Sequence, residues 1–166
     1  MLRIFRGVLV AAVVVGLFAG CAETPDGATR MVLVYFVRGE TLAAATRTVA
    51  SDAEAPERAM SELVEGPEAG ERLQTAIPSE TLLRGVAIDN GVATVDLSRS
   101  FEGGGGSLSI RLRVAQVVYT LTQFQTIQRV AFALDGTAVE AIGGEGIVVR
   151  PPVGQAAFQD LAPPRR

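Results

Sequence analysis

The pair Asn90-Gly91 constrains the fold more than any other feature of the sequence. Apolar and polar residues alternate on both sides of it, in Val86–Asp89 and in Val92–Leu97. Asn followed by Gly supplies the two positive φ angles of a type I′ turn, which joins the strands of a tight β-hairpin. Such a turn fixes the register, so that Val86 pairs with Val95. This register places the following residues on one face, which we expect to be buried: Val86, Ile88, Ala93, Val95 and Leu97.

Two strands are predicted before this hairpin. Met31–Val37 is a continuous run of apolar, β-branched and aromatic residues, which is typical of a strand covered on both faces. Arg38-Gly39-Glu40 predicts a turn, and Leu42–Val49 is expected to return as the paired strand. Tyr35 and Phe36 lie inside the first run, which favours a place in the core over a sugar-stacking surface.

Two helices are predicted from apolar residues at helical spacing. The first covers Pro56–Glu65, with Ser51 and Asp52 as N-cap candidates. The second covers Leu108–Phe124, with Ser107 as its N-cap candidate. The expected buried stripe of the second helix consists of Ile110, Val114, Val117, Leu121 and Phe124, widened by Leu112, Ala115, Val118 and Tyr119.

The second helix is followed by two more apolar runs. Val130–Leu134 predicts a strand, and Ala138–Ile142 predicts a short further one. The order of elements is then β-β-α-β-β-α-β. This order is typical of the α+β class, and we expect a mixed or antiparallel sheet of about four to five strands covered by two helices.

Composition excludes several kinds of chemistry. The chain has no histidine and a single cysteine, and its 15 basic residues are all arginines. These absences exclude imidazole bases, lysine Schiff bases, disulfides within the chain and zinc sites of histidine or thiolate ligands. The net charge of −3 argues against a nucleic-acid partner, which favours clustered basic surface. We therefore expect no catalytic residue, no cofactor and no metal site.

The first twenty residues are typical of a secretory leader. Arg3 and Arg6 precede the uncharged apolar stretch Gly7–Gly20, which is short for a membrane span. Leu17–Cys21 resembles a bacterial lipobox, which implies that Cys21 carries acyl chains such as palmitate and becomes the mature N-terminus. The alternatives are a plain secretory signal with an accidental cysteine, or a short membrane anchor. Two acyl chains anchor a protein stably, so we expect a place at the extracytoplasmic face of the cell membrane.

The sequence thus divides into four segments. They are a leader (residues 1–20), a tether (21–30), an α+β domain (31–142) and a loose Gly- and Pro-rich tail (143–166) in which Phe158 and Leu161 are the expected docking residues.

Four motifs, in order along the chain, resemble the GerMN domain of sporulation and spore-germination lipoproteins. Ser61–Pro67 is similar to its LL-x-GP helix ending, and Ala76–Pro78 with Leu82-Leu83 is similar to its IP-x-GT-x-L segment. Val92–Ser98 is similar to its VDLS strand. Tyr119–Phe124 with the later Asp135-Gly136 is similar to its TLTQFP…DG ending. The sequence departs from the family pattern at Ser79-Glu80-Thr81, where a glycine often precedes Thr, and at Gln125, which replaces a proline.

The resemblance implies an extracytoplasmic α+β domain similar to ring-building modules of envelope assemblies, with a structural or binding role linked to sporulation or germination. Relatives with a lipobox and one such domain look like actinobacterial envelope lipoproteins. The family has no recognised catalytic set. The motif residues that the resemblance carries over, with an expected structural role, are Gly66, Pro67, Pro78, Asp96, Ser98, Gln123, Phe124, Asp135 and Gly136.

Three groups of residues invite a functional interpretation. Asp96 and Ser98 suggest an acid and a nucleophile, but capping of the following loop is the favoured interpretation. Gly103–Gly106 suggests a phosphate cradle, but it lacks the GK[ST] ending, and a flexible connection is favoured. The third group is an acidic stretch around the first helix, which we expect to be a solvated face with an Arg58–Glu54 pair: Asp52, Glu54, Glu57, Glu62, Glu65, Glu68 and Glu71.

Three functions remain in view. The first is a lipid-anchored, non-enzymatic binding or assembly module of the cell envelope, whose partner is an envelope protein, a wall polymer or a second copy. The second is a small-ligand-binding lipoprotein. The third is an envelope hydrolase that uses carboxylates alone, since Asp and Glu pairs perform acid–base chemistry without histidine.

Overall fold

A computed structural model describes residues 27–144 and 147–164, so Cys21 and the apolar stretch before it lie outside the described residues. The strands are β1 (Thr29–Arg38), β2 (Thr41–Ala50), β3 (Leu83–Asp89), β4 (Val92–Leu97), β5 (Arg129–Leu134), β6 (Thr137–Ala138), β7 (Ile142–Gly144) and β8 (Ile147–Val149). The α-helices are α1 (Ala55–Glu65) and α2 (Ser107–Leu121), and two 3-10 helices are η1 (Arg99–Glu102) and η2 (Gln155–Leu161).

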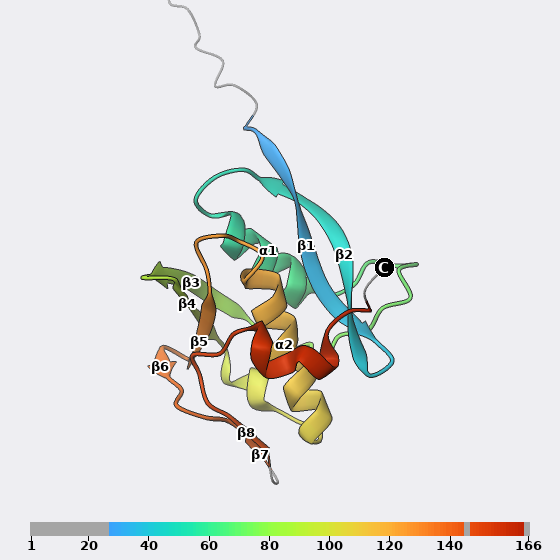
Figure 1. The fold of residues 1–166 in the computed structure, drawn as a ribbon, viewed down its shortest axis with the longest axis vertical. Helices are drawn as coiled ribbons and strands as arrows, with labels where there is room; N and C mark the ends of the chain where they lie inside the picture. Colours follow the sequence, from blue (N-terminus) through green and yellow to red (C-terminus); the bar gives the residue numbers. More distant parts are fainter. Residues whose placement is uncertain (1–26, 145–146, 165–166) are drawn as a thin grey trace, which may run out of the picture.

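The helices α1 and α2 lie between the long hairpin β1–β2 and the sheet that contains β3, β4 and β5 (Figure 1). That sheet has the order β3-β4-β5-β6 and is mixed, since β4 and β5 run parallel while its other pairs are antiparallel. The predicted α+β class and order of the first seven elements are confirmed. One arrangement differs from a single covered sheet: β1 and β2 pair only with each other.

The predicted β3–β4 hairpin is confirmed in its register, with Val86 opposite Val95. Asn90 and Gly91 have φ angles of 47° and 80°, as the type I′ turn requires. The predicted burial is confirmed only for the β4 residues of that face, which are all buried. On β3, Ile88 is 41% exposed. The reason is position, because β3 is the edge strand of its sheet and β4 lies inside it.

Each helix begins one residue before its predicted start, but the predicted N-cap residues are wrong for both. Glu54, not Ser51 or Asp52, occupies the N-cap of α1, and the Asp52 carboxylate instead accepts a hydrogen bond from the Glu54 N–H at 3.0 Å. Gly106 occupies the N-cap of α2, one residue before Ser107. Helix α2 also ends earlier than expected, at Leu121.

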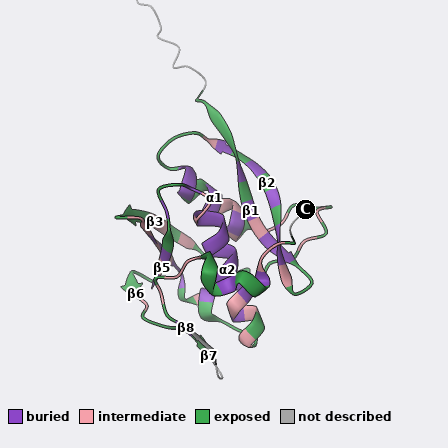
Figure 2. Cartoon of the chain, viewed as in Figure 1, coloured by how far each residue is buried: buried purple, intermediate pink, exposed green. Residues whose placement is uncertain are grey.

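Helix α2 is the centre of the core (Figure 2). Every residue of the expected stripe and its extension is buried, including Phe124, which lies beyond the end of the helix. The Tyr35 and Tyr119 rings pack with their centroids 5.4 Å apart, and Phe36 is fully buried. The described helices include none long and apolar enough to cross a membrane.

The C-terminal region differs from the sequence-based expectation. The predicted strand Ala138–Ile142 is replaced by the two-residue strand β6 and the start of the small β7–β8 ribbon. The expected loose tail contains η2, and Phe158 and Leu161 are both buried at its contact with α2. Two backbone hydrogen bonds between Val130 and Val153, of 2.8 and 2.9 Å, tie this region to β5.

The docking of η2 predicts a measurable loss of stability in a tail variant. We expect Phe158→Ala to lower the free energy of unfolding by about 3 kcal/mol, because it removes a fully buried aromatic ring. Gln159→Ala, an exposed neighbour, is the matched control. Urea unfolding of both variants measures the difference, and equal effects of the two substitutions would contradict the docking.

Candidate functional site

The motif residues Asp96 and Ser98 hold the end of β4 to its neighbours. One Asp96 carboxylate oxygen, Oδ1, accepts a hydrogen bond from the Gly136 N–H at 3.0 Å. The Ser98 Oγ accepts one from the Leu82 N–H at 2.9 Å, and the Ser98 N–H donates to the Leu82 carbonyl at 2.8 Å. Ser98 is buried. These partners lie 16 and 40 residues away in the sequence, and the Ser98 side chain makes no capping hydrogen bond to η1. The expected capping of the following loop is therefore wrong, and the two side chains instead tie β4 to distant segments.

Asp135 turns the chain after β5 and binds two arginines. It has a φ of 49°, and Gly136 follows with a φ of 78°, so the pair forms a tight left-handed turn. Its carboxylate lies 2.6 Å from the Arg84 Nη2 and 3.8 Å from the Arg99 Nε. All three side chains are exposed, so these ion pairs contribute at most about 1 kcal/mol each.

Side chains of α2 and the loop after it hydrogen-bond to the edge of β1 that faces away from β2. Both the N–H and the C=O of Leu33 bind the Gln123 amide, at 2.8 and 2.6 Å. The Tyr35 N–H donates to the Thr120 Oγ1 at 3.1 Å, and the Tyr35 C=O accepts from the Gln116 Nε2 at 3.1 Å. These side chains therefore supply the hydrogen bonds that a third strand would provide.

The same edge continues at Val37, where a loop takes over from the helix. The Val37 N–H donates to the Gln74 C=O at 2.7 Å, and the Gln74 N–H donates back at 2.9 Å. The loop is also tied to α2, because the Gln116 Oε1 accepts the Ala76 N–H at 2.8 Å. Pro78, in the same loop, accepts a hydrogen bond from the Thr81 N–H through its carbonyl.

The four-glycine loop wraps a buried cation instead of forming a free connection. Arg113 is only 2% exposed, and its guanidinium donates to the carbonyls of Phe101, Gly103 and Gly104. Its Nε donates to the Ala76 carbonyl at 3.2 Å. Burial lowers the pKa of Arg113 from its ordinary value. Because the loop turns carbonyl oxygens toward a cation, it is not arranged as a phosphate cradle. The expectation of a flexible connection is also wrong, since these hydrogen bonds attach the loop to Arg113.

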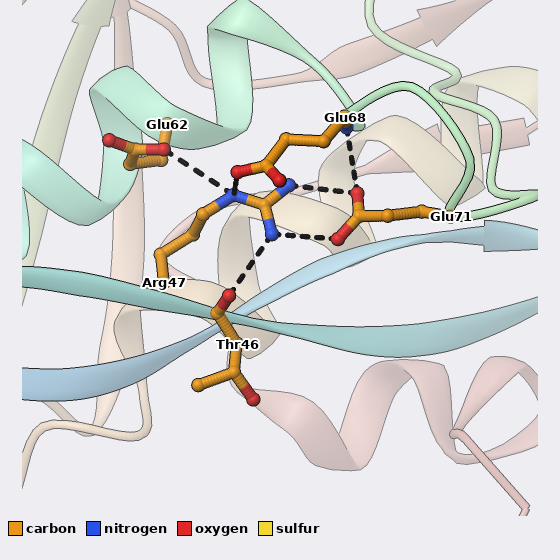
Figure 3. A network of polar contacts seen from close by, with 5 residues as sticks. All are labelled: Thr46, Arg47, Glu62, Glu68 and Glu71. Atoms are coloured by element: carbon orange, nitrogen blue, oxygen red, sulfur yellow. Dashed lines mark hydrogen bonds and ion pairs between the residues drawn. The ribbon is translucent and has the colours of Figure 1, made fainter.

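The acidic stretch is only partly the solvated face that the sequence predicted. Arg47, 6% exposed on β2, binds both oxygens of Glu71 at 2.8 Å (Figure 3). Its Nε also lies 3.4 Å from Glu62 and 3.4 Å from Glu68, and its Nη1 donates to the Thr46 carbonyl. The predicted Glu54–Arg58 pair on the exposed side is confirmed at 2.9 Å. Three acids of the stretch thus surround one buried arginine.

The motif residue Gly66 ends α1 with a φ of 98°, and its N–H donates to the Glu62 carbonyl at 3.3 Å.

Within the described ranges, no group of three or more Cys, Asp and Glu side chains is arranged to hold a metal ion.

Sequence analysis missed the polar stripe of α2. Arg113, Gln116 and Thr120 are all buried and recur three or four residues apart, so they lie on one face of a helix whose other buried residues are aliphatic or aromatic. Gln123 continues the same spacing beyond the end of the helix. This periodicity is visible in the sequence and indicates buried hydrogen bonding, but nothing in the sequence says which backbone the stripe meets.

The contact of Gln123 with β1 predicts a selective loss of stability. We expect Gln123→Ala to lower the free energy of unfolding by about 1–2 kcal/mol, because the Leu33 N–H and C=O lose their partner. Exchange of the Leu33 amide hydrogen, measured by NMR, should accelerate. Gln125→Ala changes an exposed residue of the same type and serves as the control; unaltered Leu33 exchange in Gln123→Ala would refute the role.

The Arg47–Glu71 pair predicts a pH-dependent contribution to stability. The hydrogen bond from Arg47 lowers the pKa of Glu71 below its ordinary value, so the carboxylate stabilises the fold above about pH 4.3, the pKa of an unfolded Glu. This contribution is lost as the pH falls through the lowered pKa.

We therefore expect Glu71→Gln to cost about 1–3 kcal/mol at neutral pH and progressively less below pH 4 or so. Urea unfolding across this range measures the effect. Glu57→Gln, which changes an exposed helix residue, is the matched control. A cost for Glu71→Gln that stays constant down to strongly acidic pH would count against the pair.

Comparison with known proteins identifies the family. The sequence pattern of the family described as Germane, sporulation and spore germination, matches residues 33–140. Among the curated proteins, none matches this chain significantly.

Solved structures share the fold at low sequence identity. The first GerMN domain of the sporulation protein GerM from Bacillus subtilis aligns with a TM-score of 0.64 and 21% identity, covering 76% of this chain and 98% of that domain. The tandem GerMN domains of the same protein align with a TM-score of 0.63 and 20% identity over 78% of this chain, which spans about half (48%) of that tandem chain. A protein from Clostridium perfringens described as a candidate lipoprotein aligns with a TM-score of 0.58 and 18% identity. The alignment covers 80% of this chain and 92% of that protein.

The family pattern covers well over half of the chain and contains the four motifs, and the GerMN resemblance inferred from them is confirmed. The chain belongs to the Germane family of sporulation and spore germination proteins.

Proposed function

We propose that the protein is a lipid-anchored, extracytoplasmic module of the bacterial cell envelope that binds or assembles with another envelope component and catalyses no reaction. The observation that carries the non-catalytic part is the use of the motif side chains. Asp96, Ser98 and Gln123 are engaged with backbone groups, and Asp135 is paired with two arginines. A hydrolase of the carboxylate type needs two acids facing each other across a cleft. The two acids of the motifs, Asp96 and Asp135, are instead bound to the Gly136 N–H and to two arginines.

The lipid anchor rests on the sequence around Cys21. The sole cysteine follows directly on an apolar stretch of signal-peptide length, and Leu17–Cys21 has the lipobox pattern. The likeness in fold to a candidate lipoprotein from Clostridium perfringens supports the same location for this chain. The role in sporulation or germination rests on the family and on the likeness to the GerM domains.

The anchor predicts the outcome of metabolic labelling in a bacterium that expresses the full chain. We expect the wild type to incorporate a palmitate analogue and the Cys21→Ser variant to incorporate none, because only the thiol accepts the diacylglyceryl group. Thr24→Ser, in the tether, is the control and should be labelled like the wild type. Label in Cys21→Ser, or none in the wild type, would exclude the anchor.

The assembly role is tested by crosslinking in cells, with an envelope protein, a wall polymer or a second copy as the expected product. The Cys21→Ser variant should lose these crosslinks, since it lacks the membrane attachment. Recovery of the monomer without any crosslinked envelope component would overturn the assembly role.

A further inference from the structure

The structure assigns a phosphate-binding site to the turn between β1 and β2. A hollow of about 440 Å³ opens there, lined by Val37, Arg38, Gly39, Arg72, Leu73 and Gln74. This inference deepens the proposed function, because it names the chemistry of a ligand; it rests on the binding role and not on the lipid at Cys21.

The two arginines of the hollow have no carboxylate partner among the described residues. The same is true of Arg30, Arg129 and Arg150, but Arg38 and Arg72 differ from these in lining one hollow together. Arg47, Arg58, Arg84, Arg99 and Arg111 are paired with acids, and Arg113 donates to backbone carbonyls. Arg38 and Arg72 form no ion pair with any described residue. In a chain of net charge −3, two uncompensated guanidinium groups at one hollow are a local reversal of charge.

The loop that carries Arg72 is fixed on both sides. Glu71, the preceding residue, has both carboxylate oxygens bound to Arg47 at 2.8 Å, so it is not free to neutralise its neighbour (Figure 3). Gln74 is held to Val37 by two backbone hydrogen bonds, and Arg38 directly follows Val37. The backbone positions of the two arginines are therefore set before a ligand arrives, which reduces the entropy lost on binding.

Phosphate fits this donor set better than a carboxylate does. A guanidinium group donates two parallel hydrogen bonds to a pair of oxygens, so one arginine suffices for a carboxylate. Two arginines offer two such pairs of donors. A free phosphate, with its four oxygens, accepts both pairs, whereas a carboxylate has to share its two oxygens between them, as Asp135 does between Arg84 and Arg99. The site thus suits a phosphate with three or more terminal oxygens, either free or as the phosphomonoester of a lipid headgroup.

The test uses the full chain in non-ionic detergent and two probes. Inorganic phosphate is titrated by calorimetry, with acetate as the comparison anion. Binding to vesicles of phosphatidylcholine, with and without an equal amount of phosphatidic acid, is measured without detergent by sedimentation of the full chain carrying Cys21→Ser, so that acylation plays no part. Arg38→Gln and Arg72→Gln are the site variants, and Arg150→Gln, which removes an exposed arginine outside the hollow, is the matched control.

We expect each site variant to weaken phosphate or phosphatidic acid binding about tenfold, because each removes a charge-assisted pair of hydrogen bonds. Arg150→Gln should stay within about twofold of the parent, as expected for a distant, screened charge. The probe that responds identifies the source of the phosphate. Binding of neither probe, equal losses in Arg150→Gln, or acetate bound as tightly as phosphate would overturn the site. Such a result would leave the lipid anchor untouched, because palmitate labelling tests it separately.

Discussion

The hydrogen bonding between the polar stripe of α2 and the free edge of β1 determines how the rest of the molecule is arranged. An unpaired strand edge packed against a helix leaves N–H and C=O groups that need partners, and each one that is shielded from water without a partner costs about as much as a lost hydrogen bond. Gln116, Thr120 and Gln123 satisfy those groups at Leu33 and Tyr35. Because side chains fill this role, the hairpin β1–β2 lies across the helices as a separate ribbon and does not extend the four-stranded sheet (Figure 1).

Two buried arginines hold loops in place through hydrogen bonds, as the polar stripe of α2 holds β1 in place. Arg113 binds carbonyls of the four-glycine loop, and Arg47 binds one acid of α1 and two of the loop that follows it. A buried guanidinium has five N–H donors to satisfy, so it fixes several backbone or carboxylate groups at once. Lysine, with a single ammonium, does not offer this fork of donors. The loop that Arg47 fixes is also the one that carries Arg72, so a structural ion pair helps to position the proposed phosphate site.

The motifs that identify the family have a common physical role in this chain. Asp96 and Asp135-Gly136 join the ends of the parallel strands β4 and β5, and Gln123 joins the end of α2 to β1. Each is a polar residue placed where one element ends and must be attached to another. Recognition of the family from such residues therefore reports a shared fold.

The sequence by itself determined the local structure. The Asn90-Gly91 turn, the alternation around it and the apolar stripe of α2 were enough to predict the hairpin register, the order of elements and most of the core, because these depend on residues close in the chain. Tertiary structure decided the partners of the polar residues. Arg47 meets Glu71 across 24 residues and Gln123 meets Leu33 across 90, and no local pattern encodes such pairings. The exposure of Ile88 was likewise decided only by tertiary packing, since burial depends on what covers a residue and not on the residue alone. Phe158 was expected to dock from the sequence, but its partner, helix α2, was not.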